Sequence, residues 1–270
     1  MEWKGKTVYI TGGSSGIGLE TARQLLDKGA RVALYARGEA ALASVAEAFR
    51  NRSEAPDVYH HTMDVSSWES VCEAVEESVN VFGAPDVVLN CAGVGEVGYF
   101  ETISSEAFDK VMAINVSGTR NVAAATLPYL KKNRGTLGLV SSSAGFMPVF
   151  GYSAYGASKF AVYALAEVLR YEMKRYDVTV SLFCPSEVET PMLAAERLVI
   201  PKETRALKDF AGVIPVERAA TALIHGITKG KYMIIPDFRT RFLYWMRRIT
   251  PGPIYRGASD LLAMMAAAKK

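Results

Sequence analysis

The stretch TGGSSGIG, residues 11–18, decides the fold of this 270-residue chain. It follows Thr7–Thr11, where β-branched and aromatic residues predict a strand, and it opens Gly16–Lys28, which has the pattern of a helix. Glycine lets the backbone turn sharply and lets a ligand approach the main chain, and a helix N-terminus supplies unpaired N–H groups with partial positive charge. A glycine-rich turn without a ligand is the alternative. The position between first strand and first helix favours a cradle for a dinucleotide pyrophosphate.

The rest of the sequence alternates short β-branched runs with amphipathic stretches of helical length. The further strands expected are Arg31–Tyr35, Val58–Met63, Asp86–Asn90, Thr136–Ser141 and Val178–Cys184. The further helices expected are Glu39–Asn51, Ser67–Phe82, a long helical region ending near Lys132, and Tyr152–Tyr176. This alternation predicts an α/β fold: a single Rossmann-type, doubly wound parallel sheet with helices on both faces.

No repeat, low-complexity block or linker divides the sequence, so we expect residues 1–270 to form one domain. Residues 185–216 are a long connection in which we expect no strand, and we interpret about 186–216 as a substrate lid. The last segment, about 237–270, is a basic amphipathic tail. From Lys229 to Lys270 there are nine Lys and Arg residues against two Asp residues.

Composition excludes several classes of protein. The chain is 50% hydrophobic and 22% charged, which is ordinary for a globular domain, and its net charge of +3 is too small to indicate nucleic-acid binding. Three cysteines without a C-x-x-C pair argue against disulfides and thiolate zinc sites, and the three histidines lack ligand spacing, so we expect no metal site. Met1–Gly5 leave no room for a signal peptide, and no apolar run reaches the ~18 residues of a spanning helix. We expect a cytoplasmic protein.

The end of the second strand indicates which dinucleotide binds. An acidic residue there would bind the ribose 2′-hydroxyl of NAD, whereas arginine accommodates the 2′-phosphate of NADP. The sequence reads Tyr35-Ala36-Arg37-Gly38, without an acid. Arg37 can stack on adenine and pair with phosphate oxygens, and Ser14 and Ser15 add hydroxyl donors. A solvated surface arginine is the alternative; the missing acid favours NADP(H).

Tyr155 and Lys159 are the candidate catalytic pair, because residues four apart share one face of a helix. A nearby ammonium favours the phenolate and lowers the pKa of a tyrosine toward the working range. A surface pair is the alternative for so common a spacing. Ser142 lies thirteen residues upstream at a predicted strand end, where its hydroxyl can donate to a substrate oxygen that gains negative charge. Ser141 and Ser143 are rivals for that role.

The motif T-G-x-x-x-G-I-G, with S-Y-K, resembles the short-chain dehydrogenase/reductase family from Lys6 to Met192. The resemblance implies an NADP(H)-dependent oxidoreductase that acts on CH–OH groups, with Asn115, Ser142, Tyr155 and Lys159 as catalytic residues. Ser142 would polarise a carbonyl oxygen that Tyr155 protonates, Lys159 would contact the nicotinamide ribose, and Asn115 would hold a water that returns the proton. An asparagine inside a helix is mildly unfavourable, which fits a functional reason.

The resemblance also implies a set of cofactor contacts. They are Gly12, Ser14, Ser15, Gly16, Ile17, Gly18, Arg37, Asp64, Val65, Asn90, Ala92, Gly93, Tyr155, Lys159, Pro185, Val188 and Thr190. Cys91 replaces the second Asn of the family's Asn-Asn-Ala-Gly turn, and Ser186 departs from its Pro-Gly. Asp64 alone can equally cap a helix, and Thr190-Pro191 can be a plain helix start.

Apolar residues flank the predicted active site and indicate an apolar ketone or secondary alcohol as substrate. They are Phe146, Met147, Val149, Phe150, Met192, Leu193 and Leu198. Packing of the lid or of a subunit interface is the alternative. Several segments, including Pro201-Lys202-Glu203-Thr204-Arg205, resemble the 3-ketodihydrosphingosine reductases of that family, which use NADPH to reduce a long-chain 3-keto sphingoid base. Rival functions are reduction of a steroid, a 3-oxoacyl thioester or another ketone, and a non-catalytic NADPH-binding scaffold or sensor.

The tail carries an apolar stripe on one helical face, flanked by arginines. The stripe is Phe238, Phe242, Trp245, Met246 and Ile249. A basic amphipathic helix with aromatic residues can lie on an anionic membrane, which would place the protein at the membrane periphery. Packing against the protein or a partner subunit is the alternative and the more common role of such a stripe. The family resemblance implies a homodimer or homotetramer.

Overall fold

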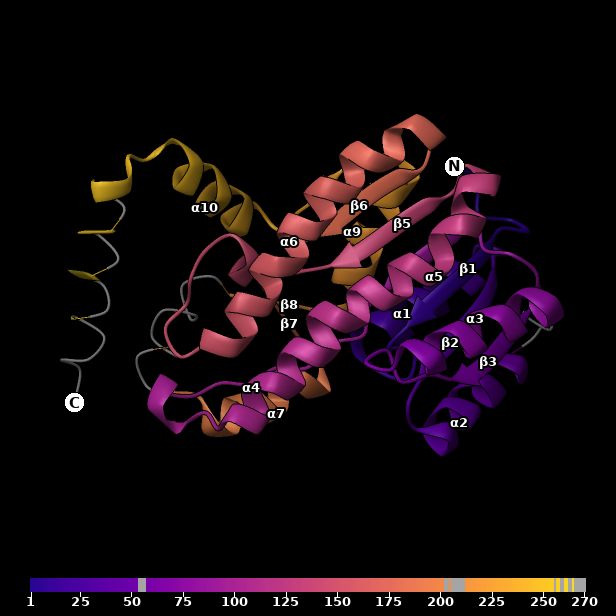
Figure 1. The fold of residues 1–270 in the computed structure, drawn as a ribbon, viewed down its shortest axis with the longest axis horizontal. Coiled ribbons are helices and arrows are strands. Elements are labelled where there is room, and N and C mark those ends of the chain that lie inside the picture. The colour runs from indigo at the N-terminus through magenta and orange to yellow at the C-terminus, as the bar shows by residue number, and fades with distance from the viewer. Residues whose placement is uncertain are drawn as a thin grey trace.

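Seven parallel strands form the central sheet in the order β3-β2-β1-β4-β5-β6-β9, with helices on both sides (Figure 1). The strands are β1 Thr7–Thr11, β2 Arg31–Ala36, β3 Val58–Thr62, β4 Val87–Asn90, β5 Thr136–Val140, β6 Thr179–Phe183 and β9 Met233–Ile234. This computed structural model describes residues 1–52, 57–201, 204, 212–254, 256, 257, 260, 261 and 264. The predicted doubly wound sheet is confirmed, because the strand order reverses direction on either side of β1 and β4.

The main helices of the described residues surround or extend the sheet. They are α1 Gly16–Leu26, α2 Glu39–Arg50, α3 Trp68–Phe82, α4 Ser105–Met112, the π-helical turn η2 Ala113–Ser117, α5 Gly118–Asn133, α6 Ser153–Met173, α7 Pro191–Val199, α9 Val216–Thr228 and α10 Phe238–Ile249. None of the helices in this part of the chain combines the length and the apolar run that crossing a bilayer requires.

Alternate residues of each strand enter two separate hydrophobic cores. On β1, Val8 and Ile10 pack with α1, α2 and α9, whereas Tyr9 faces the core under α3, α5 and α6. Both faces of the sheet are therefore covered, which explains why its strands are almost wholly apolar. Burial of both faces also fixes the pairing register, since a one-residue slip would exchange the two cores.

The connection after β6 differs from the sequence-based expectation. It contains two short strands, β7 Glu187–Val188 and β8 Val213–Ile214, which pair in parallel, and the N–H of Glu189 donates to the carbonyl of Ile214. A two-residue strand has no alternation to reveal it in a sequence. In the segment 201–205, Thr204 donates to the carbonyl of Phe150 at 2.8 Å, while Lys202, Glu203 and Arg205 lie outside the described residues.

The predicted tail helix is present as α10, at one end of the molecule and remote from the N-terminus (Figure 1). Asp237 caps it by accepting the N–H of Thr240 at 2.7 Å. Thr240 and Tyr244 are its buried residues, and Phe238, Phe242, Trp245, Met246 and Ile249 are exposed. Within this chain the predicted apolar stripe therefore faces outward and is not packed against the body of the protein. The part of the tail beyond residue 254 is only partly described.

Candidate active site

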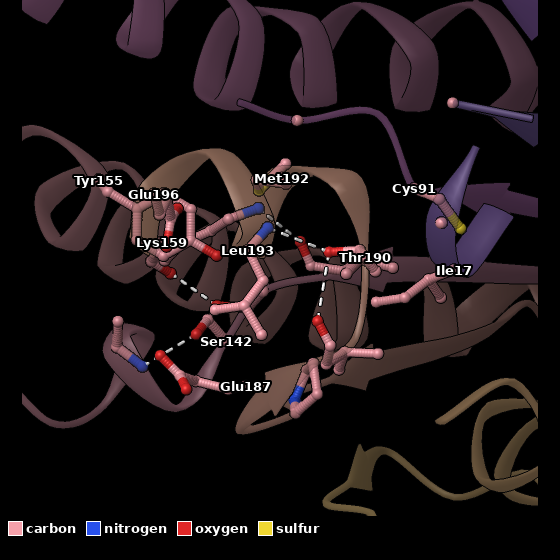
Figure 2. Close-up of a pocket in the computed structure, with 18 of the residues that line it drawn as sticks. Ile17, Cys91, Ser142, Tyr155, Lys159, Glu187, Thr190, Met192, Leu193 and Glu196 are labelled. Atoms are coloured by element: carbon pink, nitrogen blue, oxygen red, sulfur yellow. Dashed lines mark hydrogen bonds between the residues drawn. The ribbon is translucent and has the colours of Figure 1, made fainter. Parts of the chain in front are cut away.

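A pocket opens at the carboxyl ends of β1, β4, β5 and β6, where open parallel sheets bind ligands (Figure 2). Its lining is Gly12, Ser15–Gly18, Cys91–Gly93, Val140–Ala144, Val149, Tyr152, Tyr155, Lys159, Pro185–Val188, Thr190–Leu193 and Glu196. Figure 2 shows Tyr155, Lys159 and Ser142 together at one end and Ile17 and Cys91 at the other. Segments distant in the sequence thus form one elongated site.

The glycines of the β1–α1 turn are required by close contacts. A Cβ built on Gly18 would lie 2.4 Å from the carbonyl oxygen of Gly12, and Gly12 and Gly16 have positive φ of 67° and 55°. Larger residues would push α1 away from the strand and fill the floor of the pocket. The α1 N-terminus opens onto this floor, and its Ser15 cap makes no side-chain bond to the helix. The cradle fits a pyrophosphate at the helix N-terminus.

Asn90 has a structural role at the end of β4. Its side-chain oxygen Oδ1 accepts from the Thr11 hydroxyl at 2.6 Å, and its side-chain nitrogen Nδ2 donates to the Thr119 hydroxyl at 2.8 Å. Thr119 in turn donates to the backbone carbonyl of Asn115 at 2.6 Å. This buried chain of bonds joins β1, β4 and α5. Asn90 therefore supports the wall of the pocket and does not line it.

The three serines at the end of β5 have different partners. The Ser141 hydroxyl is buried and donates to the backbone carbonyl of Lys159 at 2.9 Å, so it joins β5 to α6. The Ser142 hydroxyl accepts from the N–H of Ala144 at 3.2 Å and lies within hydrogen-bonding reach of the Tyr155 phenol. Ser143 lines the pocket, and its N–H donates to the carbonyl of Pro185. Of the rivals, Ser142 is the one paired with Tyr155.

The side chains of Lys159 and Asn115 both approach Gly93. The Lys159 ammonium donates to the carbonyl of Val140 at 3.0 Å and lies 5.5 Å from the centre of the Tyr155 ring. A Cβ on Gly93 would lie 3.2 Å from Asn115 Oδ1 and 3.4 Å from Lys159 Nζ. A side chain at residue 93 would therefore separate the two groups.

Asn115 lies in the π-helical turn η2, where the helix from α4 to α5 is locally widened. Its amide oxygen accepts from the N–H of Val94 at 2.9 Å, and its amide nitrogen donates to the carbonyl of Val94 and the hydroxyl of Ser158, each at 2.9 Å. The helix is thus distorted at Asn115, and the residue joins the β4 loop to α6.

The electrostatics of Tyr155 differ from the sequence-based expectation. Burial raises its pKa above the usual value of 10, the Glu196 charge raises it further, and the bond with Ser142 lowers it less. Lys159 is not among the groups that lower this pKa. Burial lowers the pKa of the Lys159 ammonium itself to about 8. In this state the pocket holds Tyr155 as a neutral phenol.

Several predicted cofactor contacts lie outside the pocket lining. Arg37 is exposed beyond the end of β2; the pKa of Asp64, which follows β3, is lowered chiefly by hydrogen bonds from Ser66 and further by the Arg37 charge. The Asp64 carboxylate accepts from the N–H and hydroxyl of Ser66, at 2.9 and 2.6 Å, while Ser67 is the residue that caps α3. The alternative that Asp64 is the helix cap is therefore wrong. Ser14 and Val65 also lie outside the lining, as does Asn115, which was predicted as a catalytic residue.

The loop after β6 contains Ser186, which departs from the family pattern, and three residues that match it. Ser186 donates from its hydroxyl to Asp237 Oδ2 at 3.0 Å, which joins the loop to the cap of α10. Pro185, Val188 and Thr190, predicted cofactor contacts, line the pocket. Thr190 also starts α7, since its hydroxyl accepts from the N–H of Leu193 at 3.3 Å and Pro191 follows. Both interpretations of Thr190 are thus compatible.

Of the predicted apolar flank, Val149, Met192 and Leu193 line the pocket. Phe146 instead packs in the core, with its ring centre 5.1 Å from that of Tyr244, and Leu198 is 86% exposed. Met147 also packs against the core, and Phe150 lines a neighbouring groove. The described residues contain no group of three His, Cys, Asp or Glu side chains arranged to hold a metal.

Sequence reasoning missed Tyr152 and Glu196. The Tyr152 hydroxyl donates to Glu196 Oε2 at 2.7 Å, and both side chains face the pocket. Tyr152 precedes Tyr155 in a recognisable segment, so its position was accessible from the helix pattern. Glu196 gave no signal, because its direction depends on where α7 docks.

Comparison with known proteins identifies the family. The family model for short chain dehydrogenases matches residues 6–199. The chain belongs to the short-chain dehydrogenase family. It is therefore an oxidoreductase with a nucleotide-binding Rossmann fold. The 3-ketodihydrosphingosine reductase of Mus musculus is 34% identical over 232 residues, which cover 84% of this chain and 70% of that protein. The 11-beta-hydroxysteroid dehydrogenase-like 2 of Arabidopsis thaliana is 32% identical, over 92% of this chain and 78% of that protein.

Solved structures of the family share the fold. A short chain dehydrogenase/reductase from Burkholderia phymatum in complex with NAD is 26% identical with a TM-score of 0.78, covering 87% of this chain and 90% of that one. An alcohol dehydrogenase from Thermococcus sibiricus complexed with 5-hydroxy-NADP is 28% identical with a TM-score of 0.75, covering 86% and 96%. Both forms of the dinucleotide thus occur among structural relatives.

Proposed function

We propose that this oxidoreductase uses NADP(H) to reduce the ketone of a long-chain 3-keto sphingoid base of the 3-ketodihydrosphingosine type. The observation that carries the reaction class is the group formed by Ser142, Tyr155 and Lys159 at one end of the pocket. A nucleotide-binding scaffold needs none of these three side chains. Their convergence therefore favours catalysis over the alternative of a sensor.

The roles proposed for the side chains follow from their contacts. The bound dinucleotide supplies or accepts a hydride at the carbonyl carbon. Ser142 donates a hydrogen bond to the carbonyl oxygen, and the neutral Tyr155 phenol beside it gives up its proton as that oxygen gains charge. Lys159 then faces a phenolate, which favours its ammonium form. Asn115, next to Lys159 at Gly93, positions water for return of the proton.

The preference for NADP(H) rests on Arg37. It lies at the carboxyl ends of β2 and β3, beyond the glycine cradle, where the adenosine ribose of a dinucleotide on this sheet extends. The neighbouring acid, Asp64, has its carboxylate bonded to Ser66. A guanidinium without a competing acid at the strand end favours a 2′-phosphate.

The names of the relatives and the apolar wall of the pocket support a long-chain sphingoid ketone as the substrate. Five of the relatives are named 3-ketodihydrosphingosine or 3-dehydrosphinganine reductase and are 32–34% identical. Val149, Met192 and Leu193 supply an apolar wall suited to an alkyl chain. Relatives named 11-beta-hydroxysteroid dehydrogenase support a steroid as the second candidate.

We further propose that α10 lies on an anionic membrane surface, from which a lipid substrate can enter. Phe238, Trp245 and Ile249 are 77%, 57% and 69% exposed, and the helix carries four arginines without an acid. Aromatic side chains beside arginines suit the boundary of an anionic bilayer. The alternative occupant of this face is a second copy of the chain in a homodimer or homotetramer.

The test is NADPH and NADH consumption by the purified protein with 3-ketodihydrosphingosine, a ketosteroid and an acetoacetyl thioester. We expect turnover with NADPH and the sphingoid ketone, at a kcat/KM at least tenfold above the other two ketones. Preferred turnover of the steroid or the thioester would replace the substrate assignment. Absence of turnover with all three ketones would contradict the reductase proposal.

A further inference from the structure

A carboxylate on α7 faces Tyr155 in the pocket. Glu196 projects from α7 into the pocket on the same side as Tyr155 (Figure 2). Tyr152 donates to its Oε2 at 2.7 Å, and the Tyr152 and Tyr155 ring centres are 5.5 Å apart. The carboxylate also lies against the β4 loop, because a Cβ on Gly95 would be 2.0 Å from Oε1. Glu196 is thus held at a defined position beside the reacting end of the pocket.

The other charged residues of the described lining are Lys159 and Glu187. Lys159 is directed to the carbonyl of Val140, and Glu187 Oε2 lies 3.3 Å from Arg197 Nη2. Glu196 is the acid whose charge acts on Tyr155, where it raises the pKa of the phenol. Glu196 therefore adds a negative charge beside Tyr155, at the end of the pocket where Lys159 is the cation of the described lining.

A negative charge at this place is unfavourable for reduction of a neutral ketone. As hydride adds, the carbonyl oxygen becomes negative, and a nearby carboxylate repels it and opposes loss of the Tyr155 proton. A substrate with a cation beside the carbonyl reverses this effect, because the carboxylate then holds the cation and the cation stabilises the oxygen. The position of Glu196 suits an ammonium better than an apolar group.

We propose that Glu196 binds the ammonium of a substrate that carries an amine on the carbon next to its ketone. This inference rests on the proposed function, since a 3-keto sphingoid base is such a 2-amino ketone. With the ketone oxygen at Tyr155, the amine on the adjacent carbon lies on the side of the pocket that Glu196 lines. Tyr152 keeps the carboxylate in place, and the ammonium donates to it.

The experiment compares 3-ketodihydrosphingosine with its analogue lacking the amine, 1-hydroxyoctadecan-3-one, in steady-state reduction by NADPH. Glu196→Gln keeps the shape of the side chain and removes its charge. We expect the ratio of kcat/KM for the amino ketone over the analogue to fall at least tenfold, mainly through a higher KM for the amino ketone. Glu189→Gln, the same change at an exposed residue outside the pocket lining, should leave the ratio unchanged.

Tyr152→Phe separates ammonium binding from a purely structural contact. It removes the 2.7 Å hydrogen bond that positions Glu196 and retains the charge of Glu196, so the ratio should fall by less than in Glu196→Gln. If Glu196 merely fastens α7 through Tyr152, the two variants will lower kcat/KM alike for both ketones, and the proposal is overturned. An unchanged ratio in Glu196→Gln overturns it as well.

Wild-type behaviour distinguishes these results from failure of the proposed function. If wild type reduces both ketones and the kcat/KM ratio of the amino ketone over the analogue is the same in Glu196→Gln, only the role of Glu196 is overturned. If wild type reduces neither ketone, the assignment of a long-chain sphingoid substrate is overturned, and the role of Glu196 with it.

Discussion

The hydroxyl of Ser186, on the loop after β6, donates to Asp237 Oδ2 at 3.0 Å, while Asp237 Oδ1 caps α10. One carboxylate thus joins the pocket loop to the start of the exposed aromatic helix. Ser186 is 8% and Asp237 9% exposed, so neither group is readily supplied with water if its partner is lost.

Ser186→Ala should therefore lower the free energy of unfolding by about 1 kcal/mol or somewhat more, because a buried carboxylate oxygen loses its donor. Urea denaturation measures the change. Ser44→Ala, at an exposed position of α2, is the control and should change stability by less than about 0.5 kcal/mol. Equal stability of wild type and Ser186→Ala would show that the bond contributes nothing.

Arg37→Asp should change the cofactor preference from NADPH toward NADH. Loss of a guanidinium–phosphate bond and gain of a repulsive carboxylate together predict that the NADPH/NADH ratio of kcat/KM falls by about tenfold to a hundredfold or more. Lys28→Asp makes the same charge change at an exposed residue between α1 and the start of β2, and it should leave the ratio unchanged. A constant ratio in Arg37→Asp argues that NADP(H) is held elsewhere.

Lys159 predicts a specific pH dependence of stability in the cofactor-free protein. Burial lowers its pKa from the usual value of 10.5 to about 8, so between these values the unfolded chain binds more protons than the folded one. Unfolding free energy must then rise with pH across this window. Relative to Lys159→Met, we expect wild type to gain up to about 1.4 kcal/mol per pH unit. Denaturation curves of both proteins at pH 7.5, 8.5 and 9.5 measure this difference; a flat difference contradicts a buried, weakened ammonium.

The α10 surface predicts binding to anionic vesicles. Replacement of Phe238, Phe242 and Trp245 by serine should reduce co-sedimentation with phosphatidylserine-containing vesicles at least tenfold, and added salt should weaken binding of the wild type. Tyr171→Ser, at a 66% exposed aromatic residue of α6, is the control. If the triple variant binds vesicles as wild type does but loses its oligomeric state by light scattering, α10 is a subunit interface.

Much of the fold could be predicted because short stretches of sequence show the hydrophobic patterns of its strands and helices, and these patterns repeat along the chain. Strands such as Val87–Asn90 are buried on both faces and therefore read as continuous apolar runs. The Tyr155–Lys159 spacing likewise follows from helix geometry alone. In contrast, β7, β8 and β9 have two residues each, and only their partners make them strands.

The site was less predictable where tertiary contacts decide a role. Ser141, Ser142 and Ser143 are alike in sequence, and only the position of α6 assigns Ser141 to a backbone carbonyl and Ser142 to Tyr155. A lowering of the Tyr155 pKa by Lys159 was expected from a close cation, but burial and the Glu196 charge raise this pKa, and Ser142 is the group that lowers it. Burial and long-range charge are properties of the packed molecule.

Transfer of deuterium is the most direct test of the central claim, that Tyr155 serves reduction of a long-chain amino ketone. Wild type and Tyr155→Phe are incubated with 3-ketodihydrosphingosine and NADPH dideuterated at nicotinamide C4, and the product is analysed by mass spectrometry. We expect one deuterium at the new carbinol carbon with wild type, and a rate about 10²–10⁴-fold lower with Tyr155→Phe at unchanged NADPH affinity. A product without deuterium, or a Tyr155→Phe rate equal to wild type, would contradict the account.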